Sequence, residues 1–377
     1  MKHIIVRDLE EESKQIRETL EGKNINFLFG AGASMPYLKT LEISNSKFTF
    51  EDIYNESTYT DYDEKTSDYL SAYFIKNSLS LGSYDTLEKT KDPICEDIKN
   101  HYIGFIECIF SILSRNSIQQ PKRTNIFTTN YDMFFEYAFD QISRKNTQVN
   151  FNDGSYGFVH KTISTERFHT KIISVGVDSR FDYERPMFNL IKMHGSLNWR
   201  VDKEGLIYVD NDNTTLRMEF NKTQLGELIK LSEFAQKQSL EDIVNEIEDK
   251  IKSDFNGYYK RVNDLAIVKP TKRKFSETVF EEHHYQMLRI LSQELERKQS
   301  VLIAFGFSFK DEHICSIVRR SLVNPNLLMY IVCFDDDAVD LFSDIFRDYQ
   351  NVVLLSNGTC NKGRGDFTFL NSLLGGM

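Results

Sequence analysis

INFLFGAGAS, residues 25–34, joins a mostly apolar run to a turn that contains Gly30 and Gly32. The apolar part predicts a buried strand, and the glycines predict a tight turn that opens a helix. In an open α/β sheet such a turn binds phosphate, because its backbone N–H groups can approach a pyrophosphate and the helix N-terminus is partly positive. The same pattern also occurs where two backbones simply pack closely, so this motif alone leaves both interpretations open.

Three further polar segments each follow an apolar, strand-like run. They are TTNYD at residues 128–132, HGS at 194–196 and GFS at 306–308. A doubly wound sheet places its ligand-binding loops at the carboxyl ends of its strands. The four segments together therefore predict one binding cleft.

The last third of the chain alternates between strand-like and helix-like patterns. Strands are predicted at 265–268, 301–305, 328–334 and 352–355, and helices near 276–297, 311–321, 336–347 and 366–374. Such alternation predicts a parallel sheet that is covered on both faces. The predicted fold class is therefore α/β, a Rossmann-like doubly wound parallel sheet with helical insertions.

We expect a single domain over residues 1–377 with two insertions. Its core would comprise about 22–40, 121–199 and 265–377, with a helical insertion at about 41–120 and a second insertion at about 200–264. The second insertion contains a charged helical segment, 222–251, which predicts either a solvated helix face or a subunit interface.

Composition limits the class of protein. With 29 Phe, 18 Tyr and a hydrophobic content of 40%, the chain is typical of a folded globular protein. A formal net charge of −10 argues against a general nucleic-acid surface, since binding a polyanion needs clustered Lys and Arg. The first residues lack the pattern of a signal peptide, and the longest apolar runs, 301–309 and 327–334, are too short to span a bilayer. We expect a cytoplasmic protein without a membrane segment.

The cysteines predict neither a disulfide framework nor a zinc site. Their number, five, is odd, and no two of them have the C-x₂₋₄-C spacing of a zinc ribbon. We expect no bound metal.

The four segments resemble the motifs of the sirtuin superfamily, and specifically those of its divergent branch in bacterial antiphage defence proteins. The resemblance implies a Rossmann-like domain that binds NAD and cleaves its nicotinamide–ribose bond. Sirtuin deacetylases carry a four-cysteine zinc module beside the acyl-peptide cleft, and this chain has no such cysteines. The resemblance thus implies an NAD glycohydrolase that acts as a defence effector. A protein deacylase and a non-catalytic NAD- or ADP-ribose-binding module remain as alternatives.

The resemblance also implies catalytic residues. Asn130 would orient the nicotinamide ribose or a water, Asp132 would accept a hydrogen bond from the nicotinamide carboxamide, and His194 would be the base, since a histidine titrates at about pH 6.5. Sirtuins have Gln at the position of Thr129, which leaves that residue's role toward the ribose open. Asp132 could instead simply cap the helix that follows.

The same resemblance implies a set of NAD-binding residues. They are Gly30, Ala31, Gly32, Ser34, Thr129, Gly306, Ser308 and Asp335. For Ser308 an alternative is a near capping box with Asp311. We expect His283 and His284 to lie on the surface of a charged helix.

The expected partners follow from the size of the chain and from the resemblance. The catalytic fold and its insertions fill the chain, so control of a toxic NADase would come from assembly. We expect a homo-oligomer, in line with the symmetry of most assemblies. The resemblance to short defence proteins adds a separately encoded HerA-type ATPase as a possible partner.

Overall fold

The computed structural model describes residues 1–39, 43, 46–59, 64–176, 182–211, 216, 219–269, 278–359 and 363–376. Cys360 and residues 270–277 lie outside the described residues. None of the helices in the described part combines the length and apolar composition needed to cross a bilayer.

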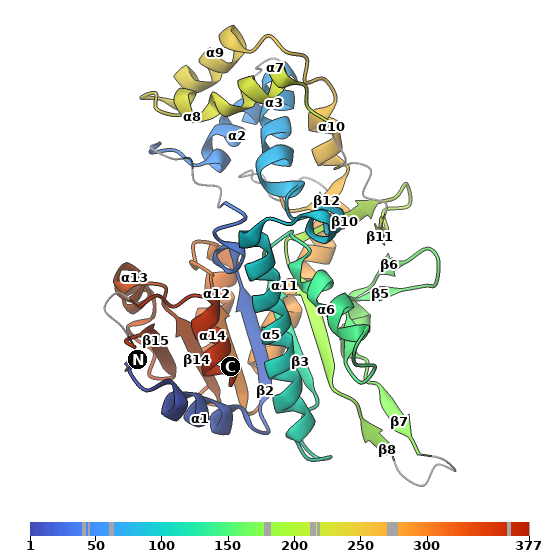
Figure 1. Ribbon diagram of the computed structural model, residues 1–377, viewed down its shortest axis with the longest axis vertical. Helices are drawn as coiled ribbons and strands as arrows, with labels where there is room; N and C mark the ends of the chain where they lie inside the picture. The colour runs from blue at the N-terminus through green and yellow to red at the C-terminus, as the bar shows by residue number, and fades with distance from the viewer. Residues whose placement is uncertain are drawn as a thin grey trace.

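The centre of the molecule is an eight-stranded sheet in which every neighbouring pair of strands is parallel (Figure 1). This confirms the predicted α/β, doubly wound fold. In sheet order the strands are β1 (Lys2–Val6), β15 (Val352–Asn357), β14 (Leu327–Val332), β13 (Ser300–Phe305), β2 (Asn24–Phe29), β3 (Arg123–Thr128), β9 (Met187–Lys192) and β4 (Asn150–Asn152).

Successive residues of the central strands face opposite sides of the sheet, and each side has its own hydrophobic core. Phe27 and Phe29 of β2 lie in one core, whereas Leu28 between them lies in the other. The first core is covered by α1 (Leu9–Leu20), α5 (Pro93–Arg115), α6 (Phe134–Ser143) and α14 (Phe367–Leu373). The second is covered by α11 (Thr278–Leu295), α12 (Glu312–Ser321) and α13 (Asp336–Phe346).

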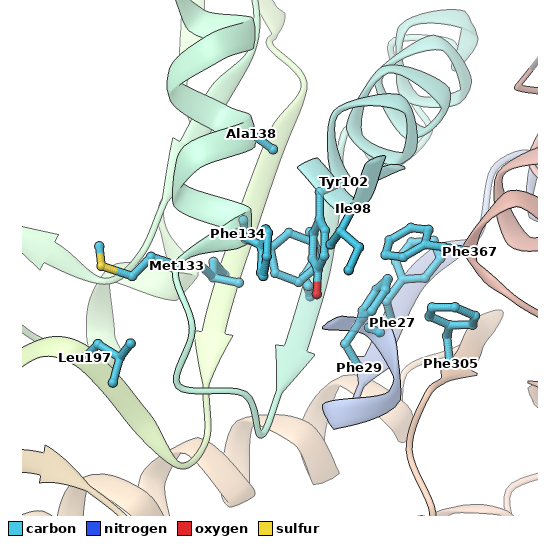
Figure 2. Packing of buried hydrophobic residues seen from close by; sticks show 14 of the residues in the cluster. Phe27, Phe29, Ile98, Tyr102, Met133, Phe134, Ala138, Leu197, Phe305 and Phe367 are labelled. Atoms are coloured by element: carbon cyan, nitrogen blue, oxygen red, sulfur yellow. The ribbon is translucent and has the colours of Figure 1, made fainter. Parts of the chain in front are cut away.

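Aromatic side chains fill the first core (Figure 2). Phe105 of α5 meets Phe27 and Phe29 edge-on, with ring centroids 4.8 and 5.1 Å apart. Such edge-to-face contacts add to the free energy gained by burial alone. Although α5 lies inside the range 41–120 expected as an insertion, it packs directly on the sheet as the crossover helix between β2 and β3.

The remaining inserted helices form one helical module beyond the carboxyl edge of the sheet, at the top of Figure 1. Helix α3 packs against α7, α9 and α10, and α2 packs against α9, so the two inserted segments meet in space. Their bounds are α2 (Phe50–Tyr59), α3 (Glu64–Phe74), α7 (Lys222–Ile229), α8 (Leu231–Phe234), α9 (Leu240–Lys250) and α10 (Tyr258–Asn263). The predicted helix over 222–251 is therefore three helices, and Tyr69 of α3 donates to Glu227 O (3.0 Å) across the module.

A π-helical turn, η2 (Ile75–Leu79), and the short helix α4 (Tyr84–Lys89) lead from α3 back to the sheet. A second, antiparallel sheet lies beside the module. In sheet order it contains β12 (Leu265–Ile267), β10 (Gly195–Val201), β11 (Ile207–Val209), β6 (Thr162–Ile163) and β5 (Ser155–Tyr156).

The strand predicted at 265–268 therefore belongs to this antiparallel sheet, which corrects the expectation that it joins the parallel one. A separate hairpin pairs β7 (Ile173–Val175) with β8 (Asp182–Glu184), and a 3₁₀ turn, η3, covers Thr165–His169.

Candidate active site

The four predicted segments meet at one edge of the parallel sheet. They follow β13, β2, β3 and β9, which are neighbours in that order and share their direction. From β2 the chain moves outward to β3 and β9, and then returns to β13 on the other side of β2. The strand order thus reverses between β2 and β13, and open α/β sheets bind their ligands in the crevice at such a point.

At this switch point the loop after β2 packs against the loop after β13, backbone to backbone. Gly30 N–H donates to Phe305 O (3.1 Å), and Gly32 N–H donates to Gly306 O (2.9 Å). Gly306 has a φ of +62°, and a Cβ there would lie 2.4 Å from Ala33 N. The close-packing interpretation of the glycine motif is therefore confirmed, whereas phosphate binding by this loop stays a prediction.

The N–H groups available to an anion are not those of Gly30 and Gly32. In the described part of the chain the N–H groups of Ala31, Phe307 and Ser308 have no hydrogen-bond partner. Ala31, Gly32 and Ser308 are exposed at the switch point. The turn also opens a four-residue 3₁₀ helix, η1 (Ala31–Ser34), so the helix expected to add positive charge is too short to supply a substantial dipole.

Ser34 lies beneath this surface in a buried polar network. It is 1% exposed, its hydroxyl donates to Asp132 Oδ2 (2.8 Å), and its Oγ lies 3.0 Å from the Tyr102 hydroxyl of α5. Figure 2 shows the Tyr102 ring beside Phe134, and the two rings are stacked 5.2 Å apart. Ser34 thus holds the glycine loop through buried hydrogen bonds and is not exposed, unlike Ala31 and Gly32.

Asn130 and Asp132 both join this network but present different groups. Asn130 Nδ2 donates to Gly30 O (3.0 Å) and lies 3.4 Å from Ser34 Oγ, which leaves its Oδ1 available to accept. Asp132 Oδ1 accepts from Phe134 N–H (3.3 Å), so the capping interpretation holds for this oxygen. Burial raises the pKa of Asp132, and this effect is opposed by Lys192 and by the bond from Ser34.

Lys192 is a part of the site that the sequence analysis missed. This last residue of β9 is 2% exposed, and its ammonium donates to Tyr131 O (3.2 Å), Asp132 O (2.5 Å) and Ser196 Oγ (3.1 Å). It also pairs with Glu136 Oε1 at 2.8 Å. Burial raises the pKa of Glu136, and Lys192 opposes that rise. A lysine inside the apolar run 187–193 was the sequence signal that could have identified it.

His194 lies between α11 and α12, two of the helices that cover the second core. Its Nε2 lies 3.3 Å from Oδ2 of Asp311, the N-cap residue of α12. Its ring lies 5.7 Å from that of His284 in α11, and His284 Nδ1 contacts Met193 O at 2.6 Å. The adjacent Gly195 has a φ of +83° and packs against Ala266 O of β12, so the glycine of the HGS segment serves packing.

His284 is 5% exposed, so the expectation that it lies on the surface was wrong. Its neighbour His283 is half-buried, with its ring 5.5 Å from Trp199. Burial lowers the pKa of each to about 4. The many charged residues of this helix suggested full exposure, but the face that carries His284 is buried against His194.

The other predicted ligand residues lie around the same edge. Thr129 is half-buried, and its N–H donates to Phe29 O (3.2 Å), which ties the β3 loop to β2. Asp311, and not Ser308, caps α12, because Asp311 Oδ1 accepts from His313 N–H and Ile314 N–H (both 3.1 Å). Asp335 Oδ1 likewise accepts from Ala338 N–H (3.0 Å) at the start of α13.

A cavity of about 700 Å³ lies elsewhere, between α4 and residues 216–225, and its lining includes Lys76 and Lys89. In the described part of the chain, no three His, Cys, Asp or Glu side chains are grouped so that they could hold a metal ion. The expectation of no bound zinc stays a prediction.

Comparison with known proteins identifies the family. No curated protein matches the chain. Residues 124–350 match the SIR2-like domain, a range that contains the TTNYD, HGS and GFS segments and more than half of the chain. The glycine loop at 30–34 precedes the match, but its pairing with Gly306 ties it to the same site. The chain belongs to the SIR2-like domain family, whose members use NAD.

Proposed function

We propose that this protein is a cytoplasmic NAD glycohydrolase that depletes NAD as an antiphage defence effector. The reaction would consume NAD and water and release nicotinamide, ADP-ribose and a proton. The observation that carries the proposal is that Asn130 and His194 follow the neighbouring parallel strands β3 and β9, at the same edge of the sheet as the glycine loop after β2, to which Asn130 is hydrogen-bonded.

The residues fit the pyrophosphate and the nicotinamide riboside part of an NAD molecule. The side-chain-poor loops at the switch point offer the unpaired N–H groups of Ala31 and Ser308 to the pyrophosphate. Asn130 is fixed through Nδ2, so its Oδ1 can accept from a ribose hydroxyl or a water. The buried Asp132 stabilises the loop through Ser34, and its proposed bond to the carboxamide would need the carboxylate to exchange one present partner.

The chemical step needs orientation and one base. As the bond to nicotinamide breaks, positive charge develops on the ribose, and water attacks the anomeric carbon from the opposite face. The nicotinamide leaves with the bonding electron pair, and His194 takes the proton from the attacking water and returns it to solvent.

The first test measures nicotinamide release from NAD by the wild-type protein and by Asn130→Ala and His194→Ala variants. Each substitution should lower the rate about 10²-fold or more, the usual scale for a positioned acid–base or orienting group. His160→Ala is the matched control, because His160 is exposed and outside the site, and its rate should equal that of wild type. Unchanged release by both site variants would contradict the assignment.

The same assay separates the alternatives. Turnover that requires an acetylated peptide would identify a deacylase. Binding of NAD without nicotinamide release would identify a non-catalytic module.

We also propose that the protein forms a homo-oligomer and joins a separately encoded HerA-type ATPase. The helical module supports this proposal, because its helices extend beyond the carboxyl edge of the sheet and offer long surfaces for contact (Figure 1).

A further inference from the structure

Residues from two other elements contact His194 and its main chain: His284 of α11 and Asp311, the N-cap residue of α12. His284 of α11 contacts the carbonyl oxygen of Met193, the residue just before His194. Because a carbonyl only accepts, His284 carries its proton on Nδ1 and donates it. Burial holds the pKa of His284 at about 4, so this ring is neutral at physiological pH. His284 therefore fixes the main chain at His194 without placing a charge there.

Asp311 contacts the His194 ring, and its two carboxylate oxygens have different tasks. Oδ1 accepts both N–H groups at the start of α12, from His313 and Ile314. Oδ2 lies 3.3 Å from His194 Nε2. The side chains of His194 and Asp311 are only 13% and 12% exposed, so water screens this contact weakly. Helix capping accounts for Oδ1 alone.

We propose that Asp311 is a positioning residue that binds His194 Nε2–H and leaves His194 Nδ1 as the nitrogen that accepts the proton. A carboxylate cannot donate, so an attractive contact between Asp311 Oδ2 and His194 Nε2 requires the proton to be on Nε2. No residue in the described part of the chain hydrogen-bonds His194 Nδ1. This inference rests on the proposed NAD cleavage and adds to it the tautomer and the partner of its base.

The charged groups around the ring are consistent with this role. Asp311 pairs with His194, and the neutral His284 lies against the His194 ring. Around these groups, Tyr131 and Cys315 interact electrostatically with Asp311, and His313 interacts with His284. The Asp311 carboxylate therefore stabilises the imidazolium that forms when His194 takes a proton.

Asp311→Asn is the informative variant. Asn is as good an N-cap as Asp, so α12 keeps its cap, but the amide N–H₂ would now face Nε2. We expect ¹⁵N spectra to show wild-type His194 protonated on Nε2 and the variant protonated on Nδ1, with the signal assigned by its loss in His194→Ala. Nicotinamide release should fall about 10²-fold or more, because the base has the wrong tautomer.

Asp8→Asn is the matched control. Asp8 caps α1 through the same two-bond geometry, with Glu10 N–H and Glu11 N–H at 3.0 and 3.1 Å, and it contacts no histidine. In this variant the His194 tautomer and the rate of nicotinamide release should equal those of wild type. An unchanged His194 tautomer together with an unchanged rate in Asp311→Asn would overturn the inference. If wild type releases no nicotinamide, the proposed function fails, whereas the ¹⁵N spectra still decide whether Asp311 holds Nε2–H.

Discussion

At the scale of single residues, Lys192 stabilises the charged forms of two buried carboxyl groups beside the site, those of Asp132 and Glu136. Its ammonium pairs with Glu136 and donates to the carbonyl oxygen of Asp132. Burial raises the pKa of both acids above their ordinary values of 4.5 and 3.8, and Lys192 is the charge that opposes the rise. A raised acid pKa means that the folded state holds its proton more tightly than the unfolded chain, so this contribution to stability is lost as the pH rises.

Replacing Lys192 with Met should lower the free energy of unfolding by about 3–5 kcal/mol, because it leaves the buried Glu136 carboxylate without its ion-pair partner and removes the charge that opposes the raised pKa of Asp132. The loss should be larger at pH 7.5 than at pH 5.5, since low pH lets the acids take up protons. Urea unfolding at the two pH values measures both effects. Lys171→Met is the control, because Lys171 is 59% exposed and its pair with Glu184 should be worth about 1 kcal/mol or less. A loss that does not depend on pH would contradict the role given to Lys192.

At the scale of elements, the site depends on the contact between the loops after β2 and β13. Gly306→Ala would place a Cβ 2.4 Å from Ala33 N and 2.8 Å from the carbonyl carbon of Gly32, at a backbone angle that costs a non-glycine residue about 1 kcal/mol or more. The two loops must then separate. We expect a lower melting temperature and weaker NAD binding by calorimetry.

Gly226→Ala is the opposite control. This glycine lies within α7, and nothing stands within 4 Å of its Cβ position. The change should stabilise the protein by about 0.5–1 kcal/mol and leave NAD binding unchanged. Equal NAD affinity in both variants would show that the loop contact does not shape the site.

The elements also show what the sequence could and could not predict. Period and length located β2, β3, β9, β13, β14 and β15, because each is an apolar run that ends in a turn signal. The pairing of β12 with β10 was missed, since three residues look the same in a parallel or an antiparallel sheet. The edge strand β1 was missed too, because half-exposed residues lack a buried pattern.

The same limit applies to the site. Asn130, Asp132 and His194 could be predicted as site residues because each belongs to a local motif, and their roles stay predictions. Lys192 and Asp311 act through partners that lie elsewhere in the chain, and local patterns do not report such contacts.

At the scale of the whole molecule, the inserted helices build one module from two distant stretches of sequence. We expect this module to contribute to self-association, and light scattering of the purified protein at micromolar concentration should give a mass that is a multiple of the 44.1 kDa chain. A strict monomer that is fully active on NAD would contradict the proposed control by assembly.

We propose that NAD binds where the strand order reverses, with its reactive end between Asn130 and His194. A crystal structure of the His194→Ala variant soaked with NAD tests this most directly. We predict the pyrophosphate between the loops at 30–34 and 306–308, and the nicotinamide ribose beside Asn130. NAD bound instead in the cavity lined by Lys76 and Lys89, with the switch point empty, would contradict it.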